Sequence, residues 1–209
     1  MDDYDFLSNP VQSQTKFIFS QWNPYREQVL GVLDSFDIQG YYRPMAHMLL
    51  DFCYPVFKNN LWQYHLLNLF LFVFASSLVY LLIAKLTGNF YLAFLAGLLY
   101  LIHPINGMVV NYISASVIAF QVICMLGALL LLLGSLERNN NRTLYFLSLL
   151  FSFLSLFWHE SGVMTPFYIG AVILLFRKES LRHKALYLLP YFLISFSYIV
   201  FRIGFLGIN

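Results

Sequence analysis

The chain has 209 residues, of which 60% are hydrophobic, 19% aromatic and only 11% charged. A soluble domain has about a quarter of its residues charged, so this composition and a mean hydropathy of +0.69 exclude an ordinary soluble protein and indicate a membrane protein. The net charge of +2, without a concentrated basic face, argues against a nucleic-acid partner. Cys53 and Cys124 indicate neither a disulfide nor a metal site.

The first sixty residues differ from the rest in charge. They contain four basic and seven acidic residues, whereas the remaining 149 contain eight basic and three acidic ones. We therefore divide the chain into a polar first loop, 1–60, and a transmembrane domain, 61–209. Within the loop, Pro44 suits a first helical turn, and the apolar side of 45–57 predicts a helix lying in the membrane interface.

Uncharged apolar runs predict the membrane spans, because a helix needs roughly 20 apolar residues to cross the hydrocarbon core. The uncharged stretch after Lys85 is too long for one helix and breaks at 103–107, which contains His103 and Pro104. The fold class we predict is an all-α polytopic membrane bundle of about six spans. The predicted spans are 61–84, 87–102, 108–134, 144–158, 162–176 and 185–201.

The basic residues predict the orientation of these spans. Alternate loops on one face hold all seven Lys and Arg residues of the short loops, and loops 103–107 and 159–161 on the other face hold none. Basic loops face the cytoplasm, so residues 1–60, His103 and Glu160 are predicted to be non-cytoplasmic. The seven basic residues are Lys85, Arg138, Arg142, Arg177, Lys178, Arg182 and Lys184.

The N-terminus predicts a preceding span. Residues 1–5 have neither the basic nor the apolar region of a signal peptide. Export of sixty polar residues is simplest if another helix precedes Met1. We therefore expect a fragment that lacks its first span, and a second truncation after Asn209.

Asp2 and Asp3 are candidate catalytic residues. Adjacent carboxylates repel one another, which raises the proton affinity of one of them and suits a general base; such a pair also suits a divalent metal. The alternative is that an extramembrane segment needs polar residues to stay dissolved. Metal dependence is left open, and no other cofactor is indicated.

Arg43 is a candidate for binding an anion. It stands at the start of the predicted interfacial helix, where a guanidinium and the positive helix end both favour phosphate. The alternative is an interfacial arginine that extends its charge into water.

Further polar residues lie at the predicted outer ends of the spans. Polar residues at membrane depth indicate function, and these residues are candidates to line an outer cavity. Helix capping and helix packing are the alternatives. The candidates are His103, Asn111, Ser114, His159 and Glu160.

The order of several short motifs resembles the membrane domain of the C-type (GT-C) glycosyltransferases over nearly the whole chain. The closest resemblance is to the transmembrane-and-tetratricopeptide-repeat group of protein O-mannosyltransferases and its bacterial relatives. The motifs are Asp2-Asp3-Tyr4-Asp5, Tyr42-Arg43-Pro44, Tyr64-His65-Leu66-Leu67-Asn68, His103-Pro104, Tyr112-Ile113-Ser114 and His159-Glu160.

This resemblance implies a multi-pass enzyme of the bacterial cell membrane or the endoplasmic reticulum. Such an enzyme transfers a sugar from a polyprenyl-phosphate donor to a protein, lipid or glycan acceptor on the non-cytoplasmic face. Asp2 or Asp3 would be the base, with Asp2 favoured, and Arg43 would contact the carrier phosphate. His103 and Glu160 would line the outer cavity.

The chain departs from these relatives at two motifs. It has Ala115-Ser116 where they often have Gly-Arg, and His159-Glu160 where they often have Lys-Glu. Two alternatives to an active transferase stay open. They are a non-enzymatic membrane protein, such as a transporter or assembly subunit, and an inactive truncated member of the family.

Overall fold

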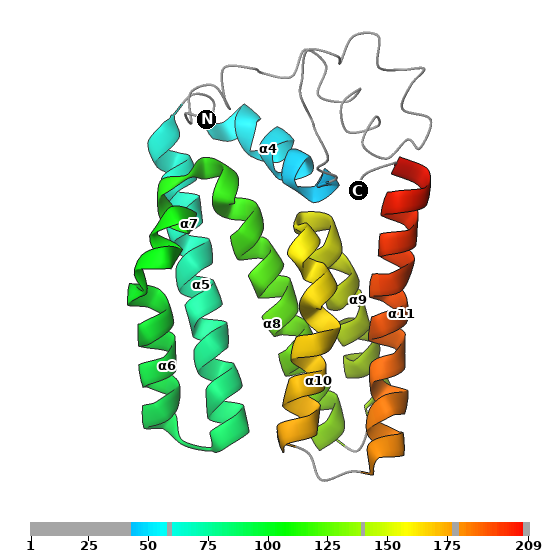
Figure 1. The fold of residues 1–209 in the computed structure, drawn as a ribbon. Coiled ribbons are helices and arrows are strands. Elements are labelled where there is room, and N and C mark those ends of the chain that lie inside the picture. Colours follow the sequence, from blue (N-terminus) through cyan, green and yellow to red (C-terminus); the bar gives the residue numbers. More distant parts are fainter. Residues whose placement is uncertain (1–42, 58–59, 139–140, 177–179, 207–209) are drawn as a thin grey trace.

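The computed structural model describes residues 43–57, 60–138, 141–176 and 180–206, and the regular elements of these residues are all helices. Figure 1 shows long helices standing side by side, with α4 lying across one end of them. The elements are α4 (Pro44–Phe57), α5 (Leu61–Thr87), α6 (Phe90–Ile102), η2 (Pro104–Asn106), α7 (Gly107–Asn111), η3 (Ile113–Ala115), α8 (Ser116–Glu137), α9 (Arg142–Trp158), η4 (Glu160–Met164), α10 (Thr165–Phe176) and α11 (Leu181–Leu206), where η denotes a 3-10 helix.

Three of the described helices are long and apolar enough to cross a membrane. They are α5, α8 and the part of α11 from Lys184 to Gly204. The apolar helices α6 and α9, and the segment Glu160–Leu175, are shorter than 18 residues. The described part of the chain is therefore all-α, and it has helices of the length and composition that suit a membrane protein.

Helix α8 is the central element of the bundle. More than half of its apolar window is buried (56%), against 28% in α5 and 17% in α11. The peripheral α6 exposes Phe90, Tyr91 and Phe94, each by 65% or more. In a membrane, large apolar side chains on the outside of a bundle contact lipid instead of water. This outer surface therefore explains the high apolar content of the sequence. The main core contains Leu82, Leu126, Ala128, Leu129, Leu132, Leu133, Ile169, Ile173 and Tyr191.

A tight turn joins α5 to α6. Gly88 has the left-handed conformation (φ 68°) that suits glycine, and its N–H donates to the Ala84 carbonyl at 2.8 Å. Asn89 then caps α6 by accepting hydrogen bonds from two of its first N–H groups. Further along, the Ser76 hydroxyl donates to the Gly97 carbonyl at 2.8 Å, which holds the two helices close together.

The segment between α6 and α8 is broken into short pieces, in contrast to the predicted single span 108–134. The span is interrupted at Tyr112, whose backbone is extended (φ −107°, ψ 123°), and α8 begins only at Ser116. Side chains of α5 stabilise the break: Asn68 donates to the Tyr112 carbonyl at 2.8 Å, and the His65 ring contacts the Val110 carbonyl at 3.1 Å. These bonds satisfy carbonyls that a continuous helix would have used itself.

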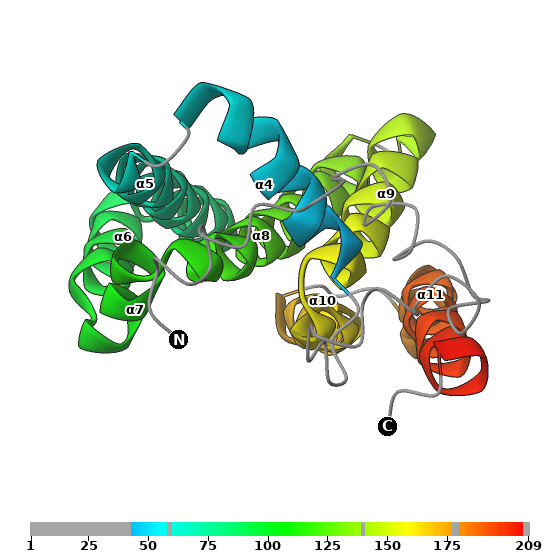
Figure 2. The ribbon, with the colours of Figure 1, turned by 90° about the horizontal axis from the view of Figure 1, so that it is seen from above.

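Helix α4 crosses the end of the bundle above α8 (Figure 2). Its apolar residues are divided between two faces. Cys53 is buried, and Phe57 packs edge-on against Tyr64 of α5 with ring centroids 5.1 Å apart. Phe52 and Val56 are 80% and 69% exposed. This division fits the predicted interfacial helix, with one side on the protein and the other turned outward.

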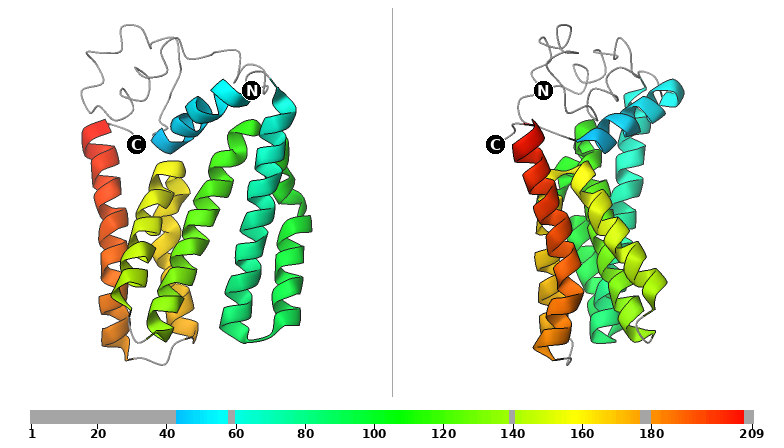
Figure 3. Two further views of the ribbon diagram at one scale, coloured as in Figure 1. Left: turned by 180° about the vertical axis from the view of Figure 1, so that it is seen from behind. Right: turned by 90° about the vertical axis from the view of Figure 1, so that its right-hand side faces the viewer.

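The two ends of the bundle differ in charge. The helices alternate in direction, so α5 and α8 end, and α9 and α11 begin, at the end opposite α4 (Figure 3). Lys85 and Glu137 form an ion pair there at 2.8 Å, which joins α5 to α8. The basic residues described at this end are Lys85, Arg138, Arg142, Arg182 and Lys184.

Candidate functional site

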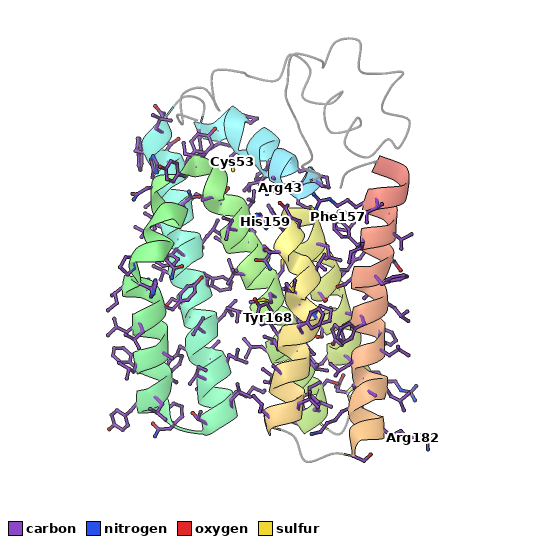
Figure 4. All side chains as sticks on the ribbon, in the orientation of Figure 1. Arg43, Cys53, Phe157, His159, Tyr168 and Arg182 are labelled. Atoms are coloured by element: carbon purple, nitrogen blue, oxygen red, sulfur yellow. The ribbon has the colours of Figure 1, made fainter. Side chains whose placement is uncertain are left out.

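Three of the predicted site residues meet under α4. Arg43 directly precedes α4, His159 follows the last residue of α9, and Glu160 begins η4. Their side chains are bonded although Arg43 lies more than a hundred positions from the other two. Figure 4 shows Arg43 and His159 together at this end, and Arg182 at the opposite end. We call Arg43, His159 and Glu160 the outer cluster.

The Arg43 guanidinium is held in a fork by the Glu160 carboxylate. Nη2 donates to Oε1 at 2.6 Å and Nε donates to Oε2 at 2.9 Å. Each side chain is 25% exposed. Two parallel bonds fix both the position and the plane of a guanidinium, so Arg43 is presented at the start of α4 in one orientation.

His159 completes the cluster from the side. Its Nε2 lies 3.1 Å from Arg43 Nη2 and its Nδ1 lies 2.8 Å from Ser161 Oγ. A guanidinium only donates hydrogen bonds, which favours a lone pair on Nε2. The Ser161 backbone N–H donates to Nδ1 at 3.2 Å, which favours a lone pair on that nitrogen too, so both contacts disfavour the doubly protonated ring. His159 is therefore a neutral imidazole in this arrangement.

The cluster shifts the pKa of both titratable partners. Burial favours the protonated form of Glu160, but the Arg43 hydrogen bond, a backbone hydrogen bond and the neighbouring positive charge outweigh it, and the pKa falls from 4.5 to about 2. Burial and then the Arg43 charge lower the pKa of His159, against the opposing charge of Glu160. At neutral pH Glu160 is ionised and His159 is neutral.

A close approach of backbone to backbone sets the position of Glu160. Gly162 packs against α9 so tightly that a Cβ there would lie 2.7 Å from the carbonyl carbon and oxygen of Ser155. The Ser155 hydroxyl also lies 3.2 Å from that of Thr165, at the start of α10. Only glycine fits this crossing, and it holds η4 against the end of α9.

The other predicted site residues lie elsewhere. Asp2 and Asp3 fall outside the described residues. His103 follows α6 and Asn111 ends α7, both are exposed, and these two helices stand beside α5, away from α10 and α11 (Figures 1 and 2). Ser114 belongs to η3, and its side chain is outside the described set. The described part of the chain therefore joins two of the five predicted cavity residues, His159 and Glu160, to Arg43.

The sequence reasoning missed residues that support this end of the bundle. Asn68 is 1% exposed and holds the broken segment before α8. Phe157 and Tyr198 pack together beside the outer cluster, with ring centroids 6.1 Å apart. The position of Asn68 inside the long apolar run 61–84 was the available signal, since a polar group within a span needs a bonded partner.

The geometry limits what the outer cluster does chemically. A carboxylate with a pKa of about 2 is a weak base at neutral pH, so Glu160 is suited to orienting Arg43 and not to removing a substrate proton. The oriented guanidinium suits recognition of a phosphate or carboxylate. Among the residues that the structure describes, no group of three or more His, Cys, Asp or Glu side chains is placed to hold a metal ion.

The function of the chain has to be inferred from this site, from the fold and from the motifs of the sequence. Comparisons of the chain with family models, curated proteins and solved structures find no match.

Proposed function

We propose that the chain is a membrane glycosyltransferase that takes a sugar from a polyprenyl-phosphate donor and transfers it to an acceptor on the non-cytoplasmic face. The sequence motifs resemble those of GT-C mannosyltransferases, and the donor is a lipid whose phosphate would lie at the membrane surface. Arg43 binds that phosphate in this proposal, and Asp2 or Asp3 acts as the base.

One observation carries the proposal. Arg43, His159 and Glu160 were each selected from the sequence as candidates for one outer site, and the structure bonds them to one another. A fixed guanidinium at the start of an interfacial helix, within reach of lipid headgroups, is a suitable receptor for a lipid-borne phosphate. An arginine that only extended its charge into water would not need a forked carboxylate partner.

The proposal includes six spans and a fixed orientation. Helices α6, α9 and α10 have 13, 17 and 12 residues, so the shortest would cover only about 18 Å at 1.5 Å per residue. The broken segments after α6 and before α10 would complete these crossings, with their backbone groups satisfied by neighbouring helices. The end that carries Lys85 and Arg138 would face the cytoplasm.

The proposed reaction is a single displacement at the anomeric carbon. The carboxylate of Asp2 or Asp3 takes the proton of the acceptor hydroxyl while the acceptor oxygen bonds to the anomeric carbon. The bond from that carbon to the phosphate oxygen breaks, and polyprenyl phosphate leaves with the electron pair. Arg43 would stabilise the charge on the leaving phosphate, and a cation already oriented by Glu160 does so without reorganisation.

A transporter is less well supported by the distribution of charge. Transporters place ionisable groups near the middle of the bilayer, in broken helices. The interiors of α6, α8 and α9 have no Asp, Glu, Lys or Arg, and the outer cluster lies at the end of the bundle. This arrangement favours chemistry at the membrane surface over passage through the membrane.

The test is sugar transfer by the full chain in lipid nanodiscs. Polyprenyl-phosphate donors carrying radiolabelled mannose, glucose or galactose are supplied with a membrane extract as the source of acceptor, and released polyprenyl phosphate is measured. We expect Asp2→Asn or Asp3→Asn to abolish turnover, and Arg43→Ala to reduce it by roughly 100-fold, the scale for losing one charge-stabilising group. Arg138→Ala, at the opposite end, is the matched control and should keep full activity.

Two results would overturn the proposal. The first is the absence of transfer from all three donors by wild-type protein whose circular dichroism shows an intact helical fold. The second is undiminished turnover in Asp2→Asn, Asp3→Asn and Arg43→Ala together.

A further inference from the structure

Arg202 lies near the end of α11 that reaches the level of α4. Helix α11 runs from the basic end toward α4 (Figures 1 and 3), and Arg202 belongs to its last turns. Its side chain is half-buried. Among the residues that the structure describes, Arg43 and Arg202 are the two Lys or Arg residues at this end. The α4 end therefore has a second guanidinium besides the one in the outer cluster.

One apolar cluster anchors the segments that carry Arg202 and the outer cluster. The rings of Phe157 and Tyr198 are in edge contact within it, with centroids 6.1 Å apart. Arg202 directly follows another member, Phe201, and each residue of the outer cluster lies within three positions of a member. The packing thus brings α4, α9, η4 and α11 together at one place. The members are Met45 from α4, Leu156 and Phe157 from α9, Val163 from η4, and Ile194, Tyr198 and Phe201 from α11.

The charge of Arg202 acts on the outer cluster. Burial lowers the pKa of His159 most, and the positive charges of Arg43 and Arg202 lower it further. The Arg202 guanidinium also interacts with the hydroxyl of Tyr198, one turn back on α11. Interactions between charges weaken with distance, so these effects agree with the packing in placing Arg202 beside the outer cluster.

Arg43 by itself offers little net charge to a phosphate. Two of its five N–H bonds are directed at Glu160 and a third at His159. Glu160 is ionised at neutral pH, so its negative charge balances that of Arg43 and repels an approaching anion. Recognition of a phosphate at this end therefore needs a second cation, and Arg202 is one.

Arg202 also borders the surface of the bundle that suits lipid. On the same helix, Val200 and Ile203 are large apolar residues with about half of their surface exposed, at 49% and 53%. In a membrane such side chains contact lipid. A phosphate carried by a lipid can therefore reach Arg202 from the membrane surface.

We propose that Arg202 is the second phosphate-binding residue of the outer site and that it binds the phosphate of the lipid donor together with Arg43. The inference rests on the proposed function, which names that donor. Arg43, held in one plane by Glu160, would orient the phosphate, and Arg202 would add the positive charge that Glu160 balances on Arg43.

The test measures binding of polyprenyl phosphate, without sugar transfer. The full chain in detergent micelles is titrated with the lipid, and the fraction of chain carrying one lipid is measured by native mass spectrometry. We expect Arg202→Ala to raise the Kd roughly 10- to 100-fold, the scale for losing a hydrogen bond to a charged group. Arg202→Lys, which keeps the charge, should recover most of this loss.

A matched variant and two further ligands complete the experiment. Arg182→Ala removes an arginine from the opposite end of the same helix (Figure 4) and should leave the Kd unchanged. Polyprenol, which lacks the phosphate, should bind weakly and equally to wild type and Arg202→Ala. Inorganic phosphate should compete only at far higher concentration, because it lacks the lipid chain.

The comparison with polyprenol separates binding from a structural role of Arg202. An arginine in the last turns of a helix also stabilises the negative helix end, and losing that effect would change the binding of both lipids. Circular dichroism confirms that each variant is folded, and Arg202→Gln takes the place of Arg202→Ala if the latter is not.

The inference and the proposed function fail in different ways. An unchanged Kd in folded Arg202→Ala, or an equal loss of polyprenol binding, would overturn the role of Arg202 even if the chain transfers sugar. Inorganic phosphate that competes as well as polyprenyl phosphate would overturn the lipid as its ligand. A raised Kd for polyprenyl phosphate alone supports the role of Arg202, even if no donor is turned over and the proposed transferase is wrong.

Discussion

Arg43 and Glu160 are separated by 117 residues and form a forked ion pair, with its shorter bond at 2.6 Å. The pair joins the start of the interfacial helix α4 to η4, the segment that connects α9 to α10. This ion pair therefore holds α4 to the bundle, and it also fixes the orientation of the Arg43 guanidinium.

The first prediction concerns the coupling free energy between Arg43 and Glu160. In a double-mutant cycle with Arg43→Ala and Glu160→Gln, we expect a coupling free energy of roughly 1–3 kcal/mol, since both side chains are three-quarters buried and the geometry is bidentate. The measurement is unfolding in mixed micelles with increasing SDS. The pair Lys85 and Glu137 is the comparison, with Glu137 49% exposed, and its coupling should stay below about 1 kcal/mol. Equal coupling in the two pairs would contradict this ranking.

The second prediction is the acid sensitivity of the pair. Glu160 has a pKa of about 2 in the folded protein against an ordinary value of 4.5, so its contribution to stability is complete above pH 4.5. Below that value the unfolded chain takes up a proton first, and the contribution is lost as the pH falls toward 2. His159 is coupled to Glu160, so both proteins carry His159→Gln. In that background the difference in unfolding free energy between the chain with Glu160 and Glu160→Gln should be constant from pH 5 to 8 and shrink by pH 3. A constant difference down to pH 3 would contradict a lowered pKa.

The lowered pKa of His159 predicts a separate loss of stability at milder pH. Burial and Arg43 lower its pKa below 6.5 in the folded state, so below pH 6.5 the unfolded chain binds a proton that the folded chain resists. Stability should therefore decrease from pH 7.5 to 5.5 in the wild type, and less in His159→Gln. Thermal unfolding followed by tryptophan fluorescence measures both. From pH 7.5 to 8.5 the two proteins should change in parallel, and identical profiles below pH 6.5 would exclude His159 as the cause.

The helices were predictable because lipid imposes a simple rule on sequence. The runs 61–84, 144–158 and 185–201 all lie within helices of the structure. Their limits were less predictable: α11 extends from Leu181 to Leu206, past the charges at which the apolar run stops. Backbone hydrogen bonding continues beyond the hydrocarbon, and long basic side chains reach the interface from inside a helix.

The sequence did not show which residues pair with one another between the helices. The break before α8 depends on Asn68 of α5 reaching the Tyr112 carbonyl, and nothing local to 108–116 shows that bond. Arg43 and Glu160 were recognisable separately as polar residues at predicted helix ends, but their pairing follows from how α4 lies across the bundle. The buried serines of α9 did have a sequence signal, since Ser148, Ser152 and Ser155 recur at helical spacing in an apolar run.

The fourth prediction tests which end of the bundle faces the cytoplasm. Cysteines are placed at two exposed positions, Asn60, which directly precedes α5 at the α4 end, and Arg138, which follows α8 at the opposite end. The background has the native Cys53 and Cys124 replaced by Ala. In sealed cells or right-side-out vesicles, an impermeant maleimide should label Asn60→Cys and spare Arg138→Cys. Labelling after membrane disruption should reach both. Labelling of Arg138→Cys alone in intact vesicles would invert the orientation.

The last prediction concerns the glycine that positions Glu160. A Cβ at Gly162 would lie 2.7 Å from the backbone of Ser155, and a backbone neighbour cannot rotate away as a side chain can. Gly162→Ala should therefore push η4 off α9 and cost about 1–3 kcal/mol of stability, and it should also reduce the coupling between Arg43 and Glu160. Gly204→Ala is the control, because nothing lies within 4 Å of its Cβ and alanine favours a helix by about 1 kcal/mol. If Gly162→Ala matches the wild type in SDS unfolding and in the double-mutant cycle, the close contact with Ser155 does not position Glu160.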